Sequence, residues 1–137
     1  MRPLIFVDTG AWLALIDRDD GHHAEARAIY RALLEQHRGL CTTNLVIAET
    51  YNLVRRRIGY EAAMQFLTVT RSSTRLTLVY SDASLEREGE RILTRYADQD
   101  FSLVDAVSFA LMNQRGMRQA FAFDKHFFVA GFELVGV

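Results

Sequence analysis

Residues Leu4-Ile5-Phe6-Val7-Asp8-Thr9-Gly10 carry the clearest structural signal in the chain. Four consecutive apolar residues followed by Asp-Thr-Gly are typical of a short buried strand that ends in a turn. The apolar run at 11–16, directly after this turn, predicts a short helix. A buried strand that leads straight into a helix is the beginning of a parallel β-α unit.

The same alternation of strand and helix continues along the sequence. Short apolar runs predict further strands at 40–42, 76–80, 120–123 and 132–137, the last of them at an edge of the sheet. Apolar residues at helical spacing predict helices at 22–36, 44–58, 61–70, 83–96 and 102–114. This order predicts an α/β fold, a three-layer α/β/α sandwich around a central, mostly parallel sheet.

Length and composition indicate one globular domain that spans residues 1–137. Of the 137 residues, 50% are hydrophobic and 24% are charged, and no Gly- or Ser-rich linker marks a domain boundary. The net charge of −1 argues against a uniformly basic nucleic-acid-binding protein, although it permits a local basic patch.

Cysteine content and the first residues bear on the cellular compartment. The single cysteine, Cys41, excludes an internal disulfide, and the start of the chain lacks the apolar segment of a signal peptide. No apolar run approaches the length that is needed to cross a membrane. We therefore expect a cytoplasmic protein with no membrane association.

Four acidic residues stand where a charge is unexpected or where chemistry is expected. Asp8 and Asp124 follow two predicted strands, and open parallel sheets bind ligands beyond the carboxyl ends of their strands. Glu49 has mostly apolar residues three and four positions away, and Asp105 is the only ionisable residue in 102–112. A buried carboxylate must be paired, protonated or bound to a metal, because an isolated buried charge is very costly.

Each of these acids also has a purely structural interpretation. Asp8 or Thr9 could cap the helix that follows the first strand. Ser102 and Asp105 have the spacing of a capping box, with Ser102 at the N-cap. These two interpretations stay open from the sequence alone.

The remaining two acids have structural interpretations of the same kind. Asp124 could cap the turn at 125–128, and Glu49 could pair with Arg55 or Arg56. Such roles explain each acid separately but do not explain why all four share one predicted edge of the sheet. Four close carboxylates raise one another's pKa, and Mg²⁺ or Mn²⁺, which prefer oxygen ligands, would relieve the repulsion.

The residues around the four acids resemble the motifs of the PIN domain over essentially the whole chain. Within this family, the small size of this single domain is most similar to that of the VapC-type toxins of prokaryotic toxin–antitoxin pairs. The motifs that carry the resemblance are Phe6-Val7-Asp8-Thr9, Ile47-Ala48-Glu49-Thr50, Phe101-Ser102-Leu103-Val104-Asp105-Ala106 and Ala122-Phe123-Asp124-Lys125-His126-Phe127.

The resemblance implies a metal-dependent endoribonuclease that hydrolyses RNA phosphodiester bonds. Asp8 and Asp105 would hold one Mg²⁺ or Mn²⁺ ion, and Glu49 and Asp124 would complete or position a second. One ion would provide hydroxide from water, and the other would stabilise charge on the leaving oxygen. The implied partners are single-stranded or structured RNA, an antitoxin protein, and a second copy of the chain in a homodimer.

Several neighbouring side chains could support such a site. Thr9 could orient Asp8 or a metal-bound water through its hydroxyl, and Ser102 could support Asp105. In the basic run 55–57, Arg55 and Arg56 are the candidates for contact with phosphate, with a solvated helix end as the alternative.

Histidines and large aromatic residues give weaker signals. His126 could contact a phosphate or lie on the surface. His22 and His23 lack the spacing of metal ligands, so we expect structural roles for them. Trp12 and Phe66 are expected to pack in the core or in an interface.

The sequence disfavours one group of rival proteins and leaves one alternative function open. Phosphatases of the dehalogenase type need a second Asp two residues after the first, where this chain has Gly10, and no glycine-rich nucleotide loop is present. The alternative from another functional class is a non-catalytic RNA- or protein-binding module in which the acids hold a structural cation.

Overall fold

The computed structural model describes residues 2–136 and contains one five-stranded sheet. All strand pairings in it are parallel, and the order is β3-β2-β1-β4-β5. The prediction of a mostly parallel sheet is therefore confirmed. The strands are β1 Ile5–Val7, β2 Leu40–Thr43, β3 Leu76–Val79, β4 Gln119–Phe121 and β5 Glu133–Leu134.

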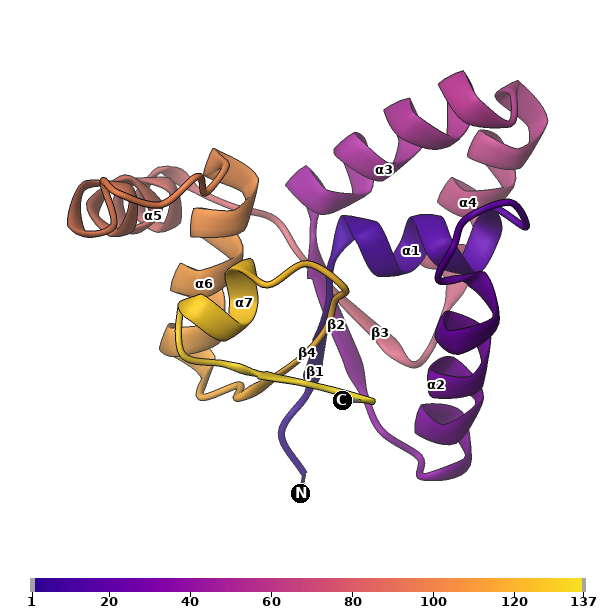
Figure 1. Cartoon of the computed structure of the whole chain (residues 1–137), viewed down its shortest axis with the longest axis horizontal. Helices are drawn as coiled ribbons and strands as arrows, with labels where there is room; N and C mark the ends of the chain where they lie inside the picture. Colours follow the sequence, from indigo (N-terminus) through magenta and orange to yellow (C-terminus); the bar gives the residue numbers. More distant parts are fainter. Residues whose placement is uncertain (1, 137) are drawn as a thin grey trace.

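Helices cover both faces of this sheet and complete the predicted three-layer sandwich (Figure 1). One side carries α1 Thr9–Ile16, α2 His23–Glu35, α3 Asn44–Arg57 and α4 Tyr60–Ser72. The other side carries α5 Ala83–Arg95, α6 Leu103–Arg115 and α7 His126–Val129. In the part of the chain that the structure describes, no helix is long and apolar enough to cross a membrane.

The core lies between the sheet and these helices. Every residue of β1 and β2 is buried, and α6 is buried at eight consecutive positions, 105–112. The ring of Phe127 stacks on Phe6 at 5.9 Å and meets the edge of Phe109 at 4.8 Å. These rings join β1, α6 and α7, and truncation of one of them would cost about 3–5 kcal/mol.

Strand β1 is the point at which the order of the sheet reverses. The chain goes from β1 to β2 on one side, whereas β4 pairs with β1 on the other side. In open α/β sheets the connections leave in opposite directions at such a point, and ligands bind in the crevice beyond the carboxyl ends of the strands. Asp8 follows β1 directly and therefore lies in this crevice.

The structure corrects the predicted end of β4. The strand ends at Phe121, not at Phe123, because its pairing with β1 ends where Val7 lies opposite Phe121. The amide of Asp8 then donates to the carbonyl of Phe121 at 3.1 Å and closes the ladder. As a result Asp124 lies in the turn before α7 and not at the end of a strand.

Other boundaries differ by smaller amounts. Helix α1 begins at Thr9, two residues before the predicted apolar run, and α2 begins at His23 with His22 at its N-cap. The final strand is restricted to Glu133–Leu134 at the edge of the sheet, shorter than the predicted 132–137. Residue 137 of that prediction lies outside the described residues.

Candidate active site

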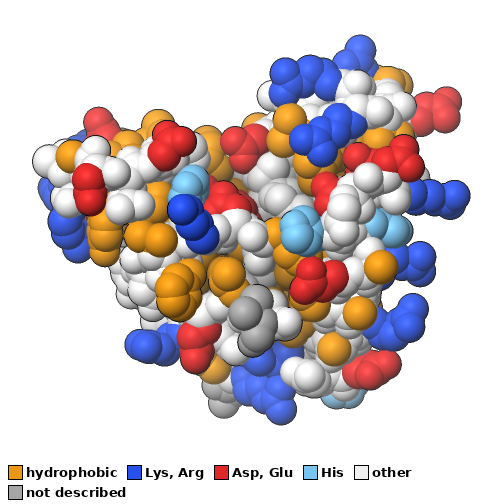
Figure 2. All heavy atoms as spheres, viewed as in Figure 1, with side chains coloured by type: hydrophobic (Ala, Val, Ile, Leu, Met, Phe, Trp, Pro, Cys, Tyr) orange, Lys and Arg blue, Asp and Glu red, His pale blue; other side chains and the backbone are white. Residues whose placement is uncertain are grey.

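A cleft of about 450 Å³ opens at the carboxyl edge of the sheet, and all four predicted acids line it. Figure 2 shows acidic and histidine side chains over the middle of this face, whereas Lys and Arg side chains gather mainly toward its outer margin. The cleft is lined by Asp8, Thr9, Gly10, Leu13, Asp20, His22, Glu49, Arg57, Ser102, Asp105, Phe123 and Asp124.

Asp8 is the most deeply placed of the four acids. Its residue exposure is 6%, and its side chain makes no capping hydrogen bond although the residue occupies the N-cap position of α1. Burial, and next the nearby carboxylate of Asp105, raise the pKa of Asp8 from 3.8 to about 7, with smaller contributions from Asp124 and Glu49. The backbone amide of Thr9 opposes this rise. The capping interpretation of Asp8 is thus wrong, and its carboxylate faces the cleft under electrostatic strain.

Asp105 has a structural role and a place in the cleft at the same time. The Ser102 hydroxyl accepts from the Asp105 amide at 3.0 Å, and Asp105 Oδ2 accepts from the Ser102 amide at 3.1 Å. This capping box, expected from the sequence, fixes the first turn of α6. It also holds the carboxylate of Asp105, which is 8% exposed, in a single direction.

Glu49 is held by Thr9. The Thr9 hydroxyl donates to Glu49 Oε1 at 2.5 Å, which connects the first turn of α1 to the middle of α3. Thr9 therefore orients Glu49, whereas the sequence suggested that it would orient Asp8 or a metal-bound water. The structure shows no ion pair of Glu49 with Arg55 or Arg56 among the described residues, so that structural interpretation is not supported.

Asp124 lies at the rim of the cleft, where His126 links it to Asp105. Asp124 Oδ1 accepts from the backbone amide of His126 at 2.6 Å, as expected for the cap of a turn. The side-chain Nδ1 of His126 lies 3.3 Å from Asp124 Oδ2 and 3.1 Å from Asp105 Oδ2. A proton on Nδ1 can be donated to both carboxylates, so His126 belongs to the site rather than to the general surface.

The arginine that reaches the cleft is Arg57. Its Nη1 lies 4.0 Å from Asp20 Oδ2, and this pairing holds the end of α3 close to the loop after α1. The guanidinium of Arg55 lies over the ring of Tyr60 at 4.9 Å, and Arg56 is exposed. Neither of these two predicted phosphate-binding residues lines the cleft.

Sequence reasoning did not assign His22 and Phe123 to the site. Their rings stack with centroids 4.3 Å apart and planes 11° apart, at one side of the cleft. His22 comes from the loop before α2, and Phe123 comes from the turn after β4. No local pattern could announce this pair, because only the folded sheet brings the two segments together.

The donor set fits a hard divalent cation in its chemistry. Four carboxylates share one cleft, and burial of Asp8, followed by the nearby charge of Asp105, raises the pKa of Asp8. Within residues 2–136, no group of three or more His, Cys, Asp or Glu side chains is already arranged as a coordination shell. Thr9 and His126 hold three of the four carboxylates, so ion binding would require these side chains to turn toward a common point.

Known proteins resemble this chain in both sequence and architecture. VapC20 of Mycobacterium tuberculosis, a 23S rRNA-specific endonuclease, is 36% identical over 129 residues, which are 94% of this chain and 95% of VapC20. The crystal structure of VapC20, described as a Sarcin-Ricin loop cleaving toxin, matches with a TM-score of 0.86 over 93% of this chain and 95% of that chain. Ribonuclease VapC26 of the same organism is 27% identical over 126 residues, 92% of this chain and 90% of VapC26.

More distant structures share the fold alone. The crystal structure of DNA-bound VapBC from Salmonella typhimurium matches with a TM-score of 0.62 at 17% identity, over 97% of both chains.

The model of the PIN domain family matches residues 5–133, a span that includes all four acids of the cleft. This chain belongs to the PIN domain family.

Proposed function

We propose that this chain is a metal-dependent endoribonuclease that hydrolyses RNA phosphodiester bonds in the acidic cleft, and that it is the toxin of a toxin–antitoxin pair. The observation that carries the proposal is the meeting of Asp8, Glu49, Asp105 and Asp124 in one cleft at the reversal point of a PIN fold. The names of VapC20 and VapC26, an endonuclease specific for 23S rRNA and a ribonuclease, support RNA as the substrate.

In this proposal the four acids divide into two pairs. Asp8 and Asp105 hold one Mg²⁺ or Mn²⁺ ion, and Glu49 and Asp124 hold or position a second. Bound there, such ions supply an activated water and stabilise the charge that develops on the leaving oxygen. The burial of Asp8 and Asp105 reduces the contact of their carboxylates with bulk water, which strengthens their interaction with positive charge.

Polar neighbours contact three of these four carboxylates. Thr9 holds Glu49 through its hydroxyl, and His126 holds Asp105 and Asp124 through Nδ1. Ser102 fixes the backbone from which Asp105 projects. Such outer partners restrict the rotamers of metal ligands and raise their basicity.

No protein nucleophile is needed for this reaction, and the cysteine of the chain does not offer one. Cys41 is buried in β2, and burial raises the pKa of its thiol to about 11. The thiolate is the reactive form of cysteine, so a thiol of this kind is inert at neutral pH. Hydrolysis by an activated water suits the site better than covalent catalysis.

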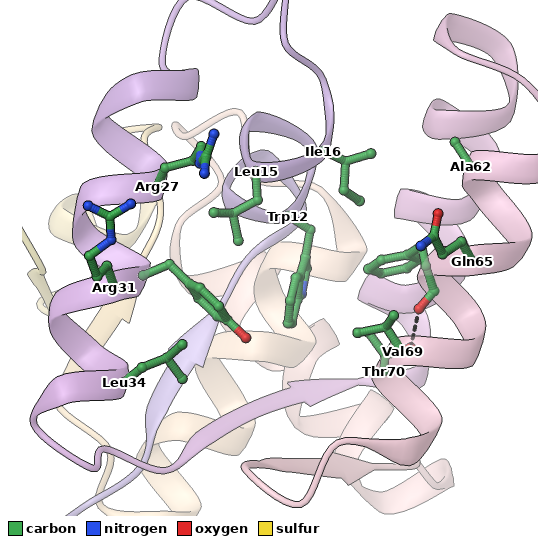
Figure 3. A pocket seen from close by; sticks show the side chains of 12 residues that line it. Trp12, Leu15, Ile16, Arg27, Arg31, Leu34, Ala62, Gln65, Val69 and Thr70 are labelled. Atoms are coloured by element: carbon green, nitrogen blue, oxygen red, sulfur yellow. Dashed lines mark hydrogen bonds between the residues drawn. The ribbon is translucent and has the colours of Figure 1, made fainter.

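The antitoxin partner is proposed to bind an apolar groove on another face (Figure 3). This groove, of about 470 Å³, lies between α1, α2 and α4 and includes Trp12, Phe66 and the exposed Val69. Arg27 and Arg31 line its α2 side, and the buried Nε1 of Trp12 has no hydrogen-bond partner among the described residues. An antitoxin segment with apolar and acidic side chains complements this surface.

A test of the groove uses the antitoxin of the proposed pair. Trp12 is the only tryptophan, so its fluorescence reports directly on occupancy of the groove. Val69→Glu should weaken binding of the antitoxin, whereas Thr68→Glu, exposed on the same helix but outside the groove, should not. Equal binding by both variants would exclude the groove as the antitoxin-binding surface.

Light scattering of the free protein tests the proposed homodimer.

The decisive test of the enzymatic proposal is RNA cleavage by the purified protein with Mg²⁺ or Mn²⁺. We expect cleavage that EDTA abolishes and that Asp8→Asn lowers by several orders of magnitude, because a metal ligand is lost. Asp98→Asn is the matched control, since Asp98 is exposed and does not line the cleft. Binding of RNA without cleavage would instead favour a non-catalytic module with a structural cation.

A further inference from the structure

We infer that the stacked rings of His22 and Phe123 form a nucleobase-binding platform at the rim of the acidic cleft. The inference rests on the proposed ribonuclease function, because it assigns a position to a base of the RNA substrate. It concerns binding of the substrate and not the hydrolysis itself. The bound chemical class is a single unpaired base, held by its flat face.

The geometry of the two rings leaves one stacking face available. The planes are 11° apart and the centroids are 4.3 Å apart, so one face of His22 is covered by Phe123. Glu25 approaches the ring of His22 at its edge, with Oε1 3.4 Å from Nδ1. The side chain of His22 is nevertheless 55% exposed, which places its second face in solvent. A base can extend the stack on that face.

Both rings are held in place by the protein. Phe123 packs against the buried ring of Phe121 in β4, with centroids 5.9 Å apart. The backbone amide of His22 donates to Asp20 Oδ1 at 2.8 Å, which fixes the loop before α2. A platform that is ordered before the ligand arrives loses little side-chain entropy on binding.

The platform lies beside the groups that would act on the RNA backbone. His22 and Phe123 line the same cleft as the four acids, and Phe123 directly precedes Asp124. Arg57, on the same cleft, offers a positive charge for a phosphate. A nucleotide with its phosphate near the acids therefore has an aromatic surface within reach of its base.

Stacking of this kind is how proteins grip unpaired RNA. Single-stranded bases are splayed out on Phe, Tyr, Trp or His rings, and every base offers a flat π-face. The platform therefore favours an unpaired base over a paired one, with little preference among bases.

The test compares His22→Ala, which removes the outer ring, with His22→Phe, which retains a stacking ring. Exposed His37, far from the lining of the cleft, provides the control His37→Asn. Steady-state cleavage gives KM and kcat for each variant. Binding of single-stranded RNA oligonucleotides that carry 2-aminopurine, whose fluorescence falls on stacking, is measured in an Asp8→Asn background.

We expect His22→Ala to raise KM by about fivefold or more, with kcat unchanged, as stacking energies of single bases predict. The same variant should lose the quenching of 2-aminopurine, while His22→Phe and His37→Asn should behave as the parent protein. An unchanged KM or unchanged quenching in His22→Ala would overturn the platform. If the wild type cleaves no RNA, the proposed function fails, and the 2-aminopurine signal alone then decides the inference.

Discussion

His126 Nδ1 lies 3.1 Å from Asp105 Oδ2, across 21 positions of sequence, and the ring of His126 is supported edge-on by Phe101 at 5.3 Å. The contact joins the first turn of α6 to the first residue of α7. Since the same nitrogen also faces Asp124, one imidazole sets the separation of a buried and an exposed carboxylate. The C-terminal part of the fold thus contributes its acids as a linked pair.

This linkage predicts that His126→Ala lowers cleavage activity by about 10- to 100-fold, the usual effect of removing a partner that orients a metal ligand. His126→Asn retains a donor and should recover part of the loss. Steady-state cleavage with a titration of Mn²⁺ measures both activity and apparent metal affinity. Full activity in His126→Ala would show that the two carboxylates need no such support.

The raised pKa of Asp8 makes the metal-free protein sensitive to pH. Because the folded-state pKa of about 7 exceeds the ordinary 3.8, the native state binds a proton that the unfolded state has lost over this range. The contribution of Asp8 to stability therefore becomes more unfavourable as pH rises from about 4 to 7, and it stays unfavourable above that.

Asp8→Asn should accordingly raise the free energy of unfolding of the metal-free protein at pH 8, by up to a few kcal/mol, and have less effect at pH 5. Urea unfolding in EDTA at the two pH values, with wild type and variant side by side, isolates Asp8 from other titrating groups. A variant that is destabilised at pH 8 would mean that the carboxylate makes a favourable contact in the folded protein.

The sequence allowed the fold to be predicted well, because its determinants are local. The first strand is an apolar run with a clear end, Leu4-Ile5-Phe6-Val7-Asp8, and strands and amphipathic helices then follow in regular alternation. The error at Phe123 has a tertiary cause. The apolar run continues to that residue, but the partner strand β1 ends earlier and the chain turns away after Phe121.

The candidate site also has features that the sequence predicts and features that only the folded structure shows. Asp8, Glu49 and Asp105 were found because a strand end and misplaced charges are visible in one dimension. Asp124 was found beside an apolar run that is not a strand up to its end, and the structure still brings all four acids into one cleft. The contacts of His126 with Asp105, of Thr9 with Glu49 and of His22 with Phe123 cross between elements, so no local spacing encodes them. Of the three arginines at 55–57, Arg57 is the one that lines the cleft, and its contact with Asp20 in another loop is also a tertiary feature.

Metal binding should stabilise the protein by an amount that grows with the logarithm of the free metal concentration above Kd. With free Mn²⁺ a hundredfold above Kd, the wild type should gain about 2.7 kcal/mol of unfolding free energy. Asp105→Asn should gain much less, because it removes one proposed ligand. Without metal, this variant loses a favourable charge at the N-terminus of α6, about 0.3–1 kcal/mol, but is relieved of repulsion with Asp8.

Denaturant unfolding with and without Mn²⁺ measures these terms, and Asp98→Asn controls for a general loss of charge. A wild type that is indifferent to Mn²⁺, together with a destabilised Asp105→Asn, would favour a purely structural role for Asp105 in the capping box. That combination would count against a metal at this site while leaving the fold unaffected.

Arg57 and Arg56 offer a matched pair for the last prediction, since only Arg57 lines the cleft and both arginines end the same helix. Arg57→Gln should raise KM for RNA. It should also reduce the slope of the logarithm of the binding constant against the logarithm of salt concentration by about one, as expected when one phosphate contact is lost. Arg56→Gln removes the same charge from the solvated side of α3 and should change neither quantity appreciably. Both are measured by RNA binding at several salt concentrations, using Asp8→Asn protein to keep the RNA intact. Equal effects of the two substitutions would indicate that the end of α3 acts only through its overall charge, and a larger effect of Arg56→Gln would place the phosphate on the opposite side of the helix.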